Sequence, residues 1–396
     1  RGDLDGSECL FRVAFKDQEG IDAGGLFRGT LTDMCEDLFP PPGREAGVDL
    51  FVRTPSCAAD PAAEPEFVPN PARSNEAASA LYRFVGVMMG VSLRFRFCMP
   101  FELAPVVWRL VAGDSVGMED LADADGAVVA LLRSIEGWMP PAGRDAARSG
   151  ADGAAGAGGG VSGQEAVEAV VALLLEGAVL GDDEALDEAM AGLPADDAAF
   201  VARFGGLRFV DSLPGGDGAP LVQGGERRLL LPASRAAFVA LVVQARLRRW
   251  TPAARMMRAG LCSMVPARVL PMLGGRDLRT FVCGSDVVDV AVLKAHTVYQ
   301  PPYNDSHATV KFFWEVMEEL SNRERQQVIR YAWGRSRLPT GEDAWRTSHG
   351  SSVAFRFLPF SGRSGSPDDS LIEAHTCFFQ LNCPAYTSKE TMRRKL

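Results

Sequence analysis

The spacing of the apolar residues changes along this 396-residue chain, and the change limits the folds that it can adopt. Residues 81–88 and 310–317 place apolar side chains at the i, i+3, i+4 and i+7 positions of a packed helix. Residues 353–360 alternate instead with the period of two that is typical of a strand. The pattern predicts that helices dominate the first three quarters of the chain and that a strand follows the helices near residue 353.

Capping signals give the ends of two C-terminal helices. Ser321 and Glu324 form a capping box, so a helix is expected to begin there and to end near Gly334. Ser388 is a suitable N-cap for a last helix. Residues 149–163 (SGADGAAGAGGGVSG) contain almost nothing to bury and are predicted to be a flexible insertion.

Charge and hydropathy exclude several classes of partner. The chain has 41 lysine and arginine residues against 51 aspartate and glutamate residues, a net charge of −10. Because nucleic-acid binding depends largely on basic side chains, no nucleic-acid partner is expected. The longest apolar stretch, residues 166–180, is interrupted by Glu168 and Glu176, and it is shorter than the ~20 residues that a membrane span needs.

The eight cysteines are scattered and include no CxxC pair, so neither a structural metal site nor a cofactor is expected. Reduced thiols are typical of the cytosol, with the nucleus as the other compartment expected. The first residues carry no apolar signal-peptide core, and the chain begins with Arg1. We expect it to be a piece of a longer polypeptide.

Cys377 is the strongest candidate for a catalytic nucleophile. It follows His375 and Thr376, between a polar loop and an apolar segment. A partly exposed thiol becomes nucleophilic when nearby donors or positive charge favour the thiolate. Taken alone, a cysteine beside Phe378 and Phe379 is more often a small core residue.

The surrounding sequence favours the chemical role, because residues 374–396 (AHTCFFQLNCPAYTSKETMRRKL) resemble the C-terminal signature of HECT-type ubiquitin ligases. The matching positions are His375, Thr376, Cys377, Phe378, Leu381, Pro384, Tyr386, Ser388, Lys389, Glu390 and Leu396.

Further motifs that resemble those of the same family occur upstream in the family's order. They are Asp22-Ala23-Gly24-Gly25 with Arg28, Pro69-Asn70-Pro71 with Phe84, Gly86 and Gly90, Phe281-Val282-Cys283-Gly284, Phe313-Trp314-Glu315 with Met317-Glu318-Glu319, and Gly334-Arg335-Ser336-Arg337-Leu338-Pro339. The resemblance covers nearly the whole chain, and details such as GRSRLP and TCFFQL are closest to the HERC-like branch.

The resemblance implies an α+β, bilobal fold. A large, mainly helical N-terminal lobe is expected over residues 1–297, with a subdomain that binds the conjugating enzyme at about 119–231. A small α/β C-terminal lobe that carries the cysteine is expected over residues 298–396. A hinge would join them near Tyr299, Pro301 and Pro302.

It also implies the chemistry of a ubiquitin-protein ligase. Cys377 would accept ubiquitin as a thioester from a conjugating enzyme and pass it to a substrate lysine, a covalent route that divides one acyl transfer into two. His375 and Thr376 would support the thiol. An acidic loop with Asp368, Asp369 and Glu373 could orient the incoming lysine, although a solvated loop is the commoner role.

Phe204, Leu207 and Phe209 flank a Gly-Gly turn in the expected enzyme-binding subdomain. They are candidates for an exposed apolar docking patch, with core packing as the alternative.

The chain departs from the family pattern at three places. Gly29 stands where the family usually has a glutamate, which puts an ion pair in doubt. Pro301 and Pro302 replace the glycines of the expected hinge, and because proline fixes φ they predict fewer lobe orientations. The family's last ~20 residues, which contain an aromatic side chain used in transfer, are absent after Leu396, so slow discharge of ubiquitin is expected.

Two other functions are compatible with a cysteine at this position. A cysteine hydrolase, such as a deubiquitinase, would need His296, His307 or His349 as the base for Cys377. A catalytically weak module would only bind ubiquitin or a conjugating enzyme. The intact HTCF motif favours the ligase over both.

Overall fold

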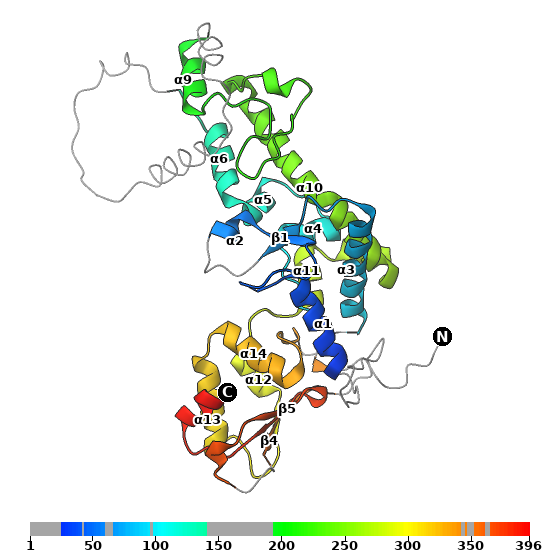
Figure 1. The fold of residues 1–396 in the computed structure, drawn as a ribbon, viewed down its shortest axis with the longest axis vertical. Helices are drawn as coiled ribbons and strands as arrows, with labels where there is room; N and C mark the ends of the chain where they lie inside the picture. The colour runs from blue at the N-terminus through cyan, green and yellow to red at the C-terminus, as the bar shows by residue number, and fades with distance from the viewer. Residues whose placement is uncertain are drawn as a thin grey trace, which may run out of the picture.

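The computed structural model describes residues 25–41, 43–59, 66–95, 98–140, 193–341, 345–346, 352–360 and 365–396. Within these ranges the buried apolar side chains form two clusters, one from Leu31 to Cys283 and one from Val288 to Met392. The chain therefore has an α+β fold with two lobes. The first lobe occupies the upper part of Figure 1 and the second, coloured yellow to red, the lower part.

The first lobe is mainly helical. Its α-helices are α1 (Gly25–Leu38), α2 (Pro55–Ala59), α3 (Glu76–Phe95), α4 (Pro105–Ala112), α5 (Met118–Ala124), α6 (Gly126–Glu136), α9 (Ala195–Arg203), α10 (Arg235–Met264) and α11 (Gly275–Cys283). Two short antiparallel strands, β1 (Phe51–Arg53) and β2 (Phe67–Pro69), complete it. None of the described helices combines the length and apolar character that a membrane crossing needs.

The core of the first lobe is built on the contact between α3 and α10. Gly86 lies against the backbone carbonyl of Met257, and Gly260 lies against that of Arg83, so neither position has room for a Cβ atom. This glycine contact decides which face of α3 is buried. Val85 and Met88 are buried as predicted, whereas Leu81 and Phe84, assigned to the same apolar stripe, are 42% and 50% exposed.

One end of this lobe stands away from the α3–α10 core. It consists of α6, α9 and residues 204–234, packed around the first half of α10, and we call it the distal end. Figure 1 shows it at the top of the molecule, at the opposite extreme from the second lobe.

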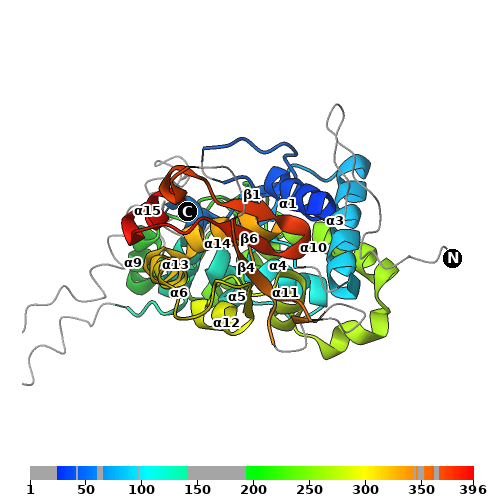
Figure 2. The same ribbon diagram turned by 90° about the horizontal axis from the view of Figure 1, so that it is seen from below.

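The second lobe surrounds a four-stranded sheet with the order β3 (Thr297–Tyr299), β4 (Phe355–Pro359), β6 (Gln380–Cys383) and β5 (Glu373–His375). The first two pairings are parallel, and β5 runs antiparallel to β6. The helices are α12 (Val290–Ala295), α13 (Ala308–Glu319), α14 (Asn322–Trp333) and α15 (Lys389–Lys395). Figure 2 shows α13 and α15 together at one side of this lobe.

The capping predictions for this lobe are confirmed. The Ser321 hydroxyl accepts a hydrogen bond from the Glu324 amide while the Glu324 carboxylate accepts one from the Ser321 amide at 2.8 Å, and α14 begins there. It ends at Gly334, which has a φ of +73°. Ser388 caps α15 through the Thr391 amide at 3.1 Å. The predicted strand corresponds to β4.

The residues predicted as the hinge lie inside the second lobe. Tyr299 belongs to β3, which is paired with β4, and its hydroxyl accepts a hydrogen bond from Trp314 Nε1 at 2.9 Å. Pro301 and Pro302 lead directly to Tyr303, which is buried in the second cluster. A pivot at these residues would have to break the sheet, because β3 is one of its strands.

The chain passes from one cluster to the other between Cys283 and Val288. Gly284 has a φ of +73° there, and a Cβ atom would approach the Leu338 carbonyl to 2.7 Å. The next amide, of Ser285, donates to the same carbonyl at 3.1 Å. The lobe boundary at residue 297 stays a prediction, and the division of the core lies about ten residues earlier.

Candidate functional site

Cys377 lies in the tight connection between two strands. His375 and Gln380 are opposite each other in the β5–β6 pair, and residues 376–378 form a single 3-10 turn between them. Phe379 closes the connection with a φ of +50°, a left-handed conformation that costs a residue with a side chain about 1–2 kcal/mol. Such a strained turn persists only where the surroundings hold it in place.

The two phenylalanines after Cys377 have opposite environments. Phe379 is 1% exposed, and its ring stacks on that of Trp333 with a centroid distance of 4.1 Å. Phe378 is 59% exposed. The stacked ring fixes the turn to α14, and the thiol of Cys377 is held half-buried at the surface.

Helix α14 forms the floor beside this turn. Gln327, Arg330 and Tyr331 line a shallow depression of about 460 Å³, together with Ala374 and Thr376. The Tyr331 hydroxyl also donates to the Ile372 carbonyl at 2.8 Å, which ties the start of β5 to the same helix. The cysteine is thus placed next to an open hollow that carries one guanidinium group.

The turn also lies where the two lobes meet, against α1 of the first lobe. Arg330 binds Asp33 at 3.0 Å and pairs with Glu36, and the Thr32 hydroxyl donates to the Gly334 carbonyl at 2.9 Å. Figure 1 shows α1 directly above β5.

His375 and Thr376, the residues predicted to support the thiol, have different surroundings. Thr376 contributes to the hollow, whereas His375 is exposed at the end of β5. Glu373 is two residues earlier on the same strand, so it shares the exposed face with His375.

The two aspartates of the predicted acidic loop lie in residues 367–369, a turn that precedes β5. Asp368 accepts hydrogen bonds from the Thr387 amide at 3.0 Å and hydroxyl at 2.5 Å. These bonds hold the pKa of the Asp368 carboxyl below its ordinary value. They also connect this loop to the C-terminal segment that contains Thr387. Asp369 is exposed.

Two of the histidines that a hydrolase would need are engaged in the scaffold. His296 stacks on Trp345 with a centroid distance of 4.1 Å, and His307 caps α13 by accepting from the Thr309 amide at 3.2 Å. His349 lies outside the described residues.

The apolar docking patch predicted at Phe204, Leu207 and Phe209 is wrong, because these side chains are 1%, 3% and 1% exposed. Phe204 packs on Phe200 and Phe209 on Phe238, with centroids 4.8 Å and 5.7 Å apart. Gly205 and Gly206 both have positive φ, so the chain reverses tightly and both flanks return to the core.

The apolar residues that the distal end does expose follow α6. Met139 is 79% exposed, and Trp138 is half-buried with its ring 5.1 Å from that of Phe200. The sequence carries a signal for them, since two large apolar residues directly follow Gly137, the glycine that ends the helix.

Four cysteines other than Cys377 are poor nucleophiles in this structure. Burial raises the pKa of Cys283 to about 12 and raises those of Cys35, Cys98 and Cys383. Among the described residues, no three His, Cys, Asp or Glu side chains are grouped in a way that could hold a metal ion.

Comparison with known proteins agrees with this geometry. Residues 45–396 match the HECT-domain (ubiquitin-transferase) family. The chain is 25% identical over 388 residues to the E3 ubiquitin-protein ligase HERC2 of Mus musculus, which covers 98% of this chain and 7% of that protein. It is 24% identical over 400 residues to the probable E3 ubiquitin-protein ligase HECTD4 of Homo sapiens, 98% of this chain and 9% of the relative.

A shorter match, 31% identical over 137 residues, joins 35% of this chain to 17% of the E3 ubiquitin-protein ligase pub1 of Schizosaccharomyces pombe. The chain thus spans less than a tenth of the length of the HERC2 and HECTD4 relatives. The similarity to HERC2 agrees with the predicted HERC-like branch. Because the family match extends over residues 45–396, this chain belongs to the HECT-domain family of ubiquitin transferases.

Proposed function

We propose that this chain is a ubiquitin-protein ligase that carries ubiquitin as a thioester on Cys377. The observation that carries the proposal is the half-exposed thiol in a turn held by Phe379, beside the hollow on α14. Its partners would be ubiquitin, a ubiquitin-conjugating enzyme and a protein substrate.

The reaction has two acyl transfers. The Cys377 thiolate attacks the carbonyl of the thioester between ubiquitin and the conjugating enzyme, and the enzyme's thiolate leaves. A substrate lysine then attacks the new thioester as the free amine, an isopeptide bond forms, the Cys377 thiolate leaves and the amine loses a proton. Since each step exchanges one acyl bond for another, catalysis consists mainly of bringing the groups together.

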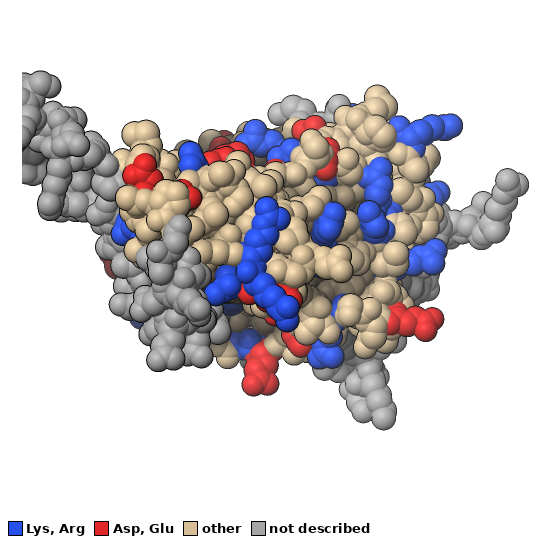
Figure 3. All heavy atoms as spheres, turned by 90° about the horizontal axis from the view of Figure 1, so that it is seen from above, with Lys and Arg blue, Asp and Glu red and all other residues tan. Residues whose placement is uncertain are grey.

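The conjugating enzyme would dock at the distal end, where Trp138 and Met139 are accessible. Figure 3 views the molecule from this end. Most of the described surface there is uncharged (tan), and basic side chains (blue) are more prominent than acidic ones (red). Contiguous apolar residues on a surface, unlike single ones, mark protein-binding sites, so the proposal relies on Trp138 and Met139 being adjacent.

Ubiquitin would then have to cross most of the molecule, because Figure 1 places the distal end and β5 at opposite sides of the α3–α10 core. We propose that the second lobe moves about residues 284–287, where the chain passes between the two cores. The lobe interface next to α1 would open in the same movement.

A loading assay tests the proposal. The chain is incubated with activating enzyme, ubiquitin and a panel of conjugating enzymes, and the products are separated with and without reductant. We expect a reducible adduct of the mass of one ubiquitin that is absent from Cys377→Ala and present in Cys262→Ala, a half-buried cysteine of α10. Absence of an adduct with every conjugating enzyme, from a folded sample, would contradict the proposal.

We also propose the cytosol as the compartment, with the nucleus as the alternative. None of the seven cysteines in the described ranges forms a disulfide, which supports a reducing environment. Microscopy of a fluorescent fusion of the full-length protein would check it, and localisation to the secretory pathway would contradict it.

A further inference from the structure

Helix α10 is shared by two parts of the first lobe that pack on different halves of it. Its second half is fixed to the core, where Met257 and Gly260 meet α3 and the Arg258 guanidinium donates to the Val111 carbonyl at 2.8 Å. Its first half belongs to the distal end, where Phe238 packs on Phe209.

A proline interrupts the helix between these two halves. Pro252 has no N–H group, so it gives no hydrogen bond to the carbonyl of Arg248. The Thr251 hydroxyl donates to the carbonyl one residue earlier, that of Leu247, at 2.9 Å. With one backbone hydrogen bond missing, α10 bends most easily at this point.

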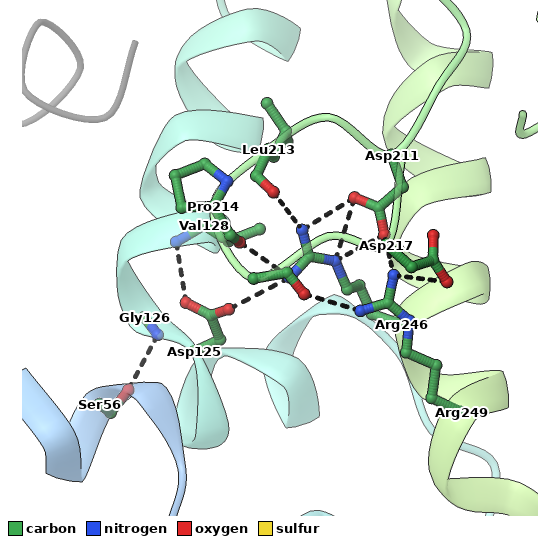
Figure 4. A network of polar contacts seen from close by, with 11 residues as sticks. Ser56, Asp125, Gly126, Val128, Asp211, Leu213, Pro214, Asp217, Arg246 and Arg249 are labelled. Carbon is green, nitrogen blue, oxygen red and sulfur yellow. Dashed lines mark hydrogen bonds and ion pairs between the residues drawn. The ribbon is translucent and has the colours of Figure 1, made fainter. Parts of the chain in front are cut away.

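A buried group of charges lies one to two turns before the proline, as Figure 4 shows. The Arg246 side chain is 5% exposed. Its guanidinium donates to Asp211 at 2.8 Å from both Nε and Nη2, and it donates to the carbonyls of Leu213 and Pro214, each at 3.0 Å. Arg249 donates to the second Asp211 oxygen at 2.6 Å.

This group also reaches the point where α5 ends and α6 begins, because Asp125 is the C-cap of α5 and the N-cap of α6. Arg246 Nη1 lies 3.6 Å from Asp125, which caps α6 by accepting from the Val128 amide at 3.2 Å. The first amide of α6, that of Gly126, donates to the Ser56 hydroxyl of α2 at 3.0 Å. We call the set Asp125, Asp211, Arg246 and Arg249 the junction network.

A fully buried ion pair is a weak source of stability, because desolvation offsets most of the attraction, and its better attested use is to fix one arrangement of the parts that it joins. The junction network therefore joins residues 211–217 and α10 of the distal end to the α5–α6 connection, which is itself bonded to α2, close to the place where α10 is easiest to bend.

We infer that the junction network holds the distal end in one orientation about Pro252, and that it thereby sets the rate at which ubiquitin reaches Cys377. The inference rests on the proposed function. Arg246 and Asp125 are positioning residues in it: they touch neither ubiquitin nor the conjugating enzyme, and they fix the angle at which the bound enzyme presents its thioester.

Single-turnover transfer from a ubiquitin-charged conjugating enzyme tests this inference. The rate of thioester formation on Cys377 is measured against the concentration of the chain for the natural sequence, Arg246→Leu and Asp125→Asn. We expect the maximal rate to fall roughly tenfold or more in both variants, since misplacement by about 1 Å can cost a factor of 100. The concentration that gives half the maximal rate should stay within about twofold, because the docking surface is unchanged.

Two further variants make the test specific. Arg248→Leu, on the exposed side of the same helix, should leave the maximal rate unchanged. Pro252→Ala restores the missing backbone hydrogen bond, so it should recover part of the rate when combined with Asp125→Asn. Asp125→Asn also guards against unfolding, because asparagine keeps the size and the helix cap.

A purely structural role predicts a different result. Loss of folded protein would lower the charging of Cys377 and the discharge of preloaded ubiquitin to lysine by the same factor, whereas the inference requires discharge to be unaffected. An unchanged maximal rate, or a raised half-maximal concentration at an unchanged rate, would overturn it. If the natural sequence forms no thioester at all, the proposed function fails instead.

Discussion

At the scale of single residues, the environment of Cys377 is decided by the backbone conformation of its second neighbour. The positive φ of Phe379 sends its side chain into the core against Trp333, and Phe378 is left in solvent. The stacked ring offsets the cost of the left-handed conformation, because a buried aromatic side chain contributes several kcal/mol through burial and packing.

Removing the two rings one at a time should have unequal effects. Phe379→Ala is expected to lower the free energy of unfolding of the second lobe by about 3–5 kcal/mol, the usual cost of deleting a buried aromatic side chain. Phe378→Ala should change it by less than about 0.5 kcal/mol, as most surface substitutions do. Hydrogen exchange of the β6 amides in denaturant measures the second lobe separately, and equal effects of the two variants would contradict the assignment.

The cysteines should differ in reactivity in the folded protein. Native alkylation at pH 8 followed by mass spectrometry should modify Cys377 and leave Cys283 and Cys383 unmodified. Burial raises the pKa of Cys283 to about 12, so its reactive thiolate forms only in strong alkali, and about one molecule in ten thousand carries it at pH 8. Modification of Cys283 before Cys377 would show that the first core is open in solution.

The sequence identified Cys377 but not the burial of its neighbours. The HTCF motif is a local pattern that predicts the turn. It does not say which ring will be buried, because the ring that covers Phe379 belongs to Trp333 of α14, about 45 residues earlier. The same limit applies to Phe204, Leu207 and Phe209, whose direction depends on two glycines with positive φ. Apolar character alone does not say on which side of a tight turn a residue lies.

At the scale of elements, the tight contact of α3 with α10 depends on glycine. Gly260 brings α10 against the backbone of α3 so closely that the Arg83 carbonyl occupies the place of a side chain. Helix packing at this distance excludes even a methyl group, and the loss of helix propensity at glycine is the cost of the contact.

Two glycine-to-alanine substitutions should therefore have opposite signs. Gly260→Ala places a methyl group on the Arg83 carbonyl, and we expect it to lower the free energy of unfolding by about 1–3 kcal/mol through overpacking. Gly29→Ala, within α1 and with no heavy atom within 4 Å of the added carbon, should raise it by about 0.5–1 kcal/mol. Thermal unfolding of both variants checks the signs, and stabilisation by Gly260→Ala would mean that the helices are farther apart.

Helices were easier to predict than their orientation. The periodicity predicted α3 and α13, and the capping signals at Ser321 and Ser388 predicted ends of α14 and α15 that agree with the structure to within a residue or two. The stripe on α3 was misassigned at Leu81 and Phe84, because the glycine face, not the most apolar face, makes the contact.

At the scale of the whole molecule, ion pairs between charged side chains join the two lobes. Arg330 of α14 faces Asp33 and Glu36 of α1, and Arg337 donates to Glu102 at 2.8 Å with its side chain 4% exposed. Arg337 belongs to the GRSRLP motif, so that motif has a role in joining the lobes that the sequence alone did not reveal.

Reversing the charge of Arg330 should loosen this interface. Arg330→Glu faces two carboxylates, and we expect the α1 amides to exchange about three to ten times faster, since exposed ion pairs contribute about 0.2–1 kcal/mol each and repulsion adds to their loss. Arg393→Glu is the control, because Arg393 pairs with Glu319 inside the second lobe. Equal α1 protection in both variants would show that these ion pairs do not hold the lobes together.

The α3–α10 contact also has a consequence for folding during synthesis on the ribosome. About 170 residues separate Gly86 from the Met257 backbone that covers it. At a synthesis rate of about 5–20 residues per second, α3 emerges roughly 10–30 seconds before its partner helix exists. During that interval its apolar side chains have no native surface to cover them, so the nascent N-terminal half is a substrate for chaperones, and a stalled ribosome would expose an aggregation-prone fragment.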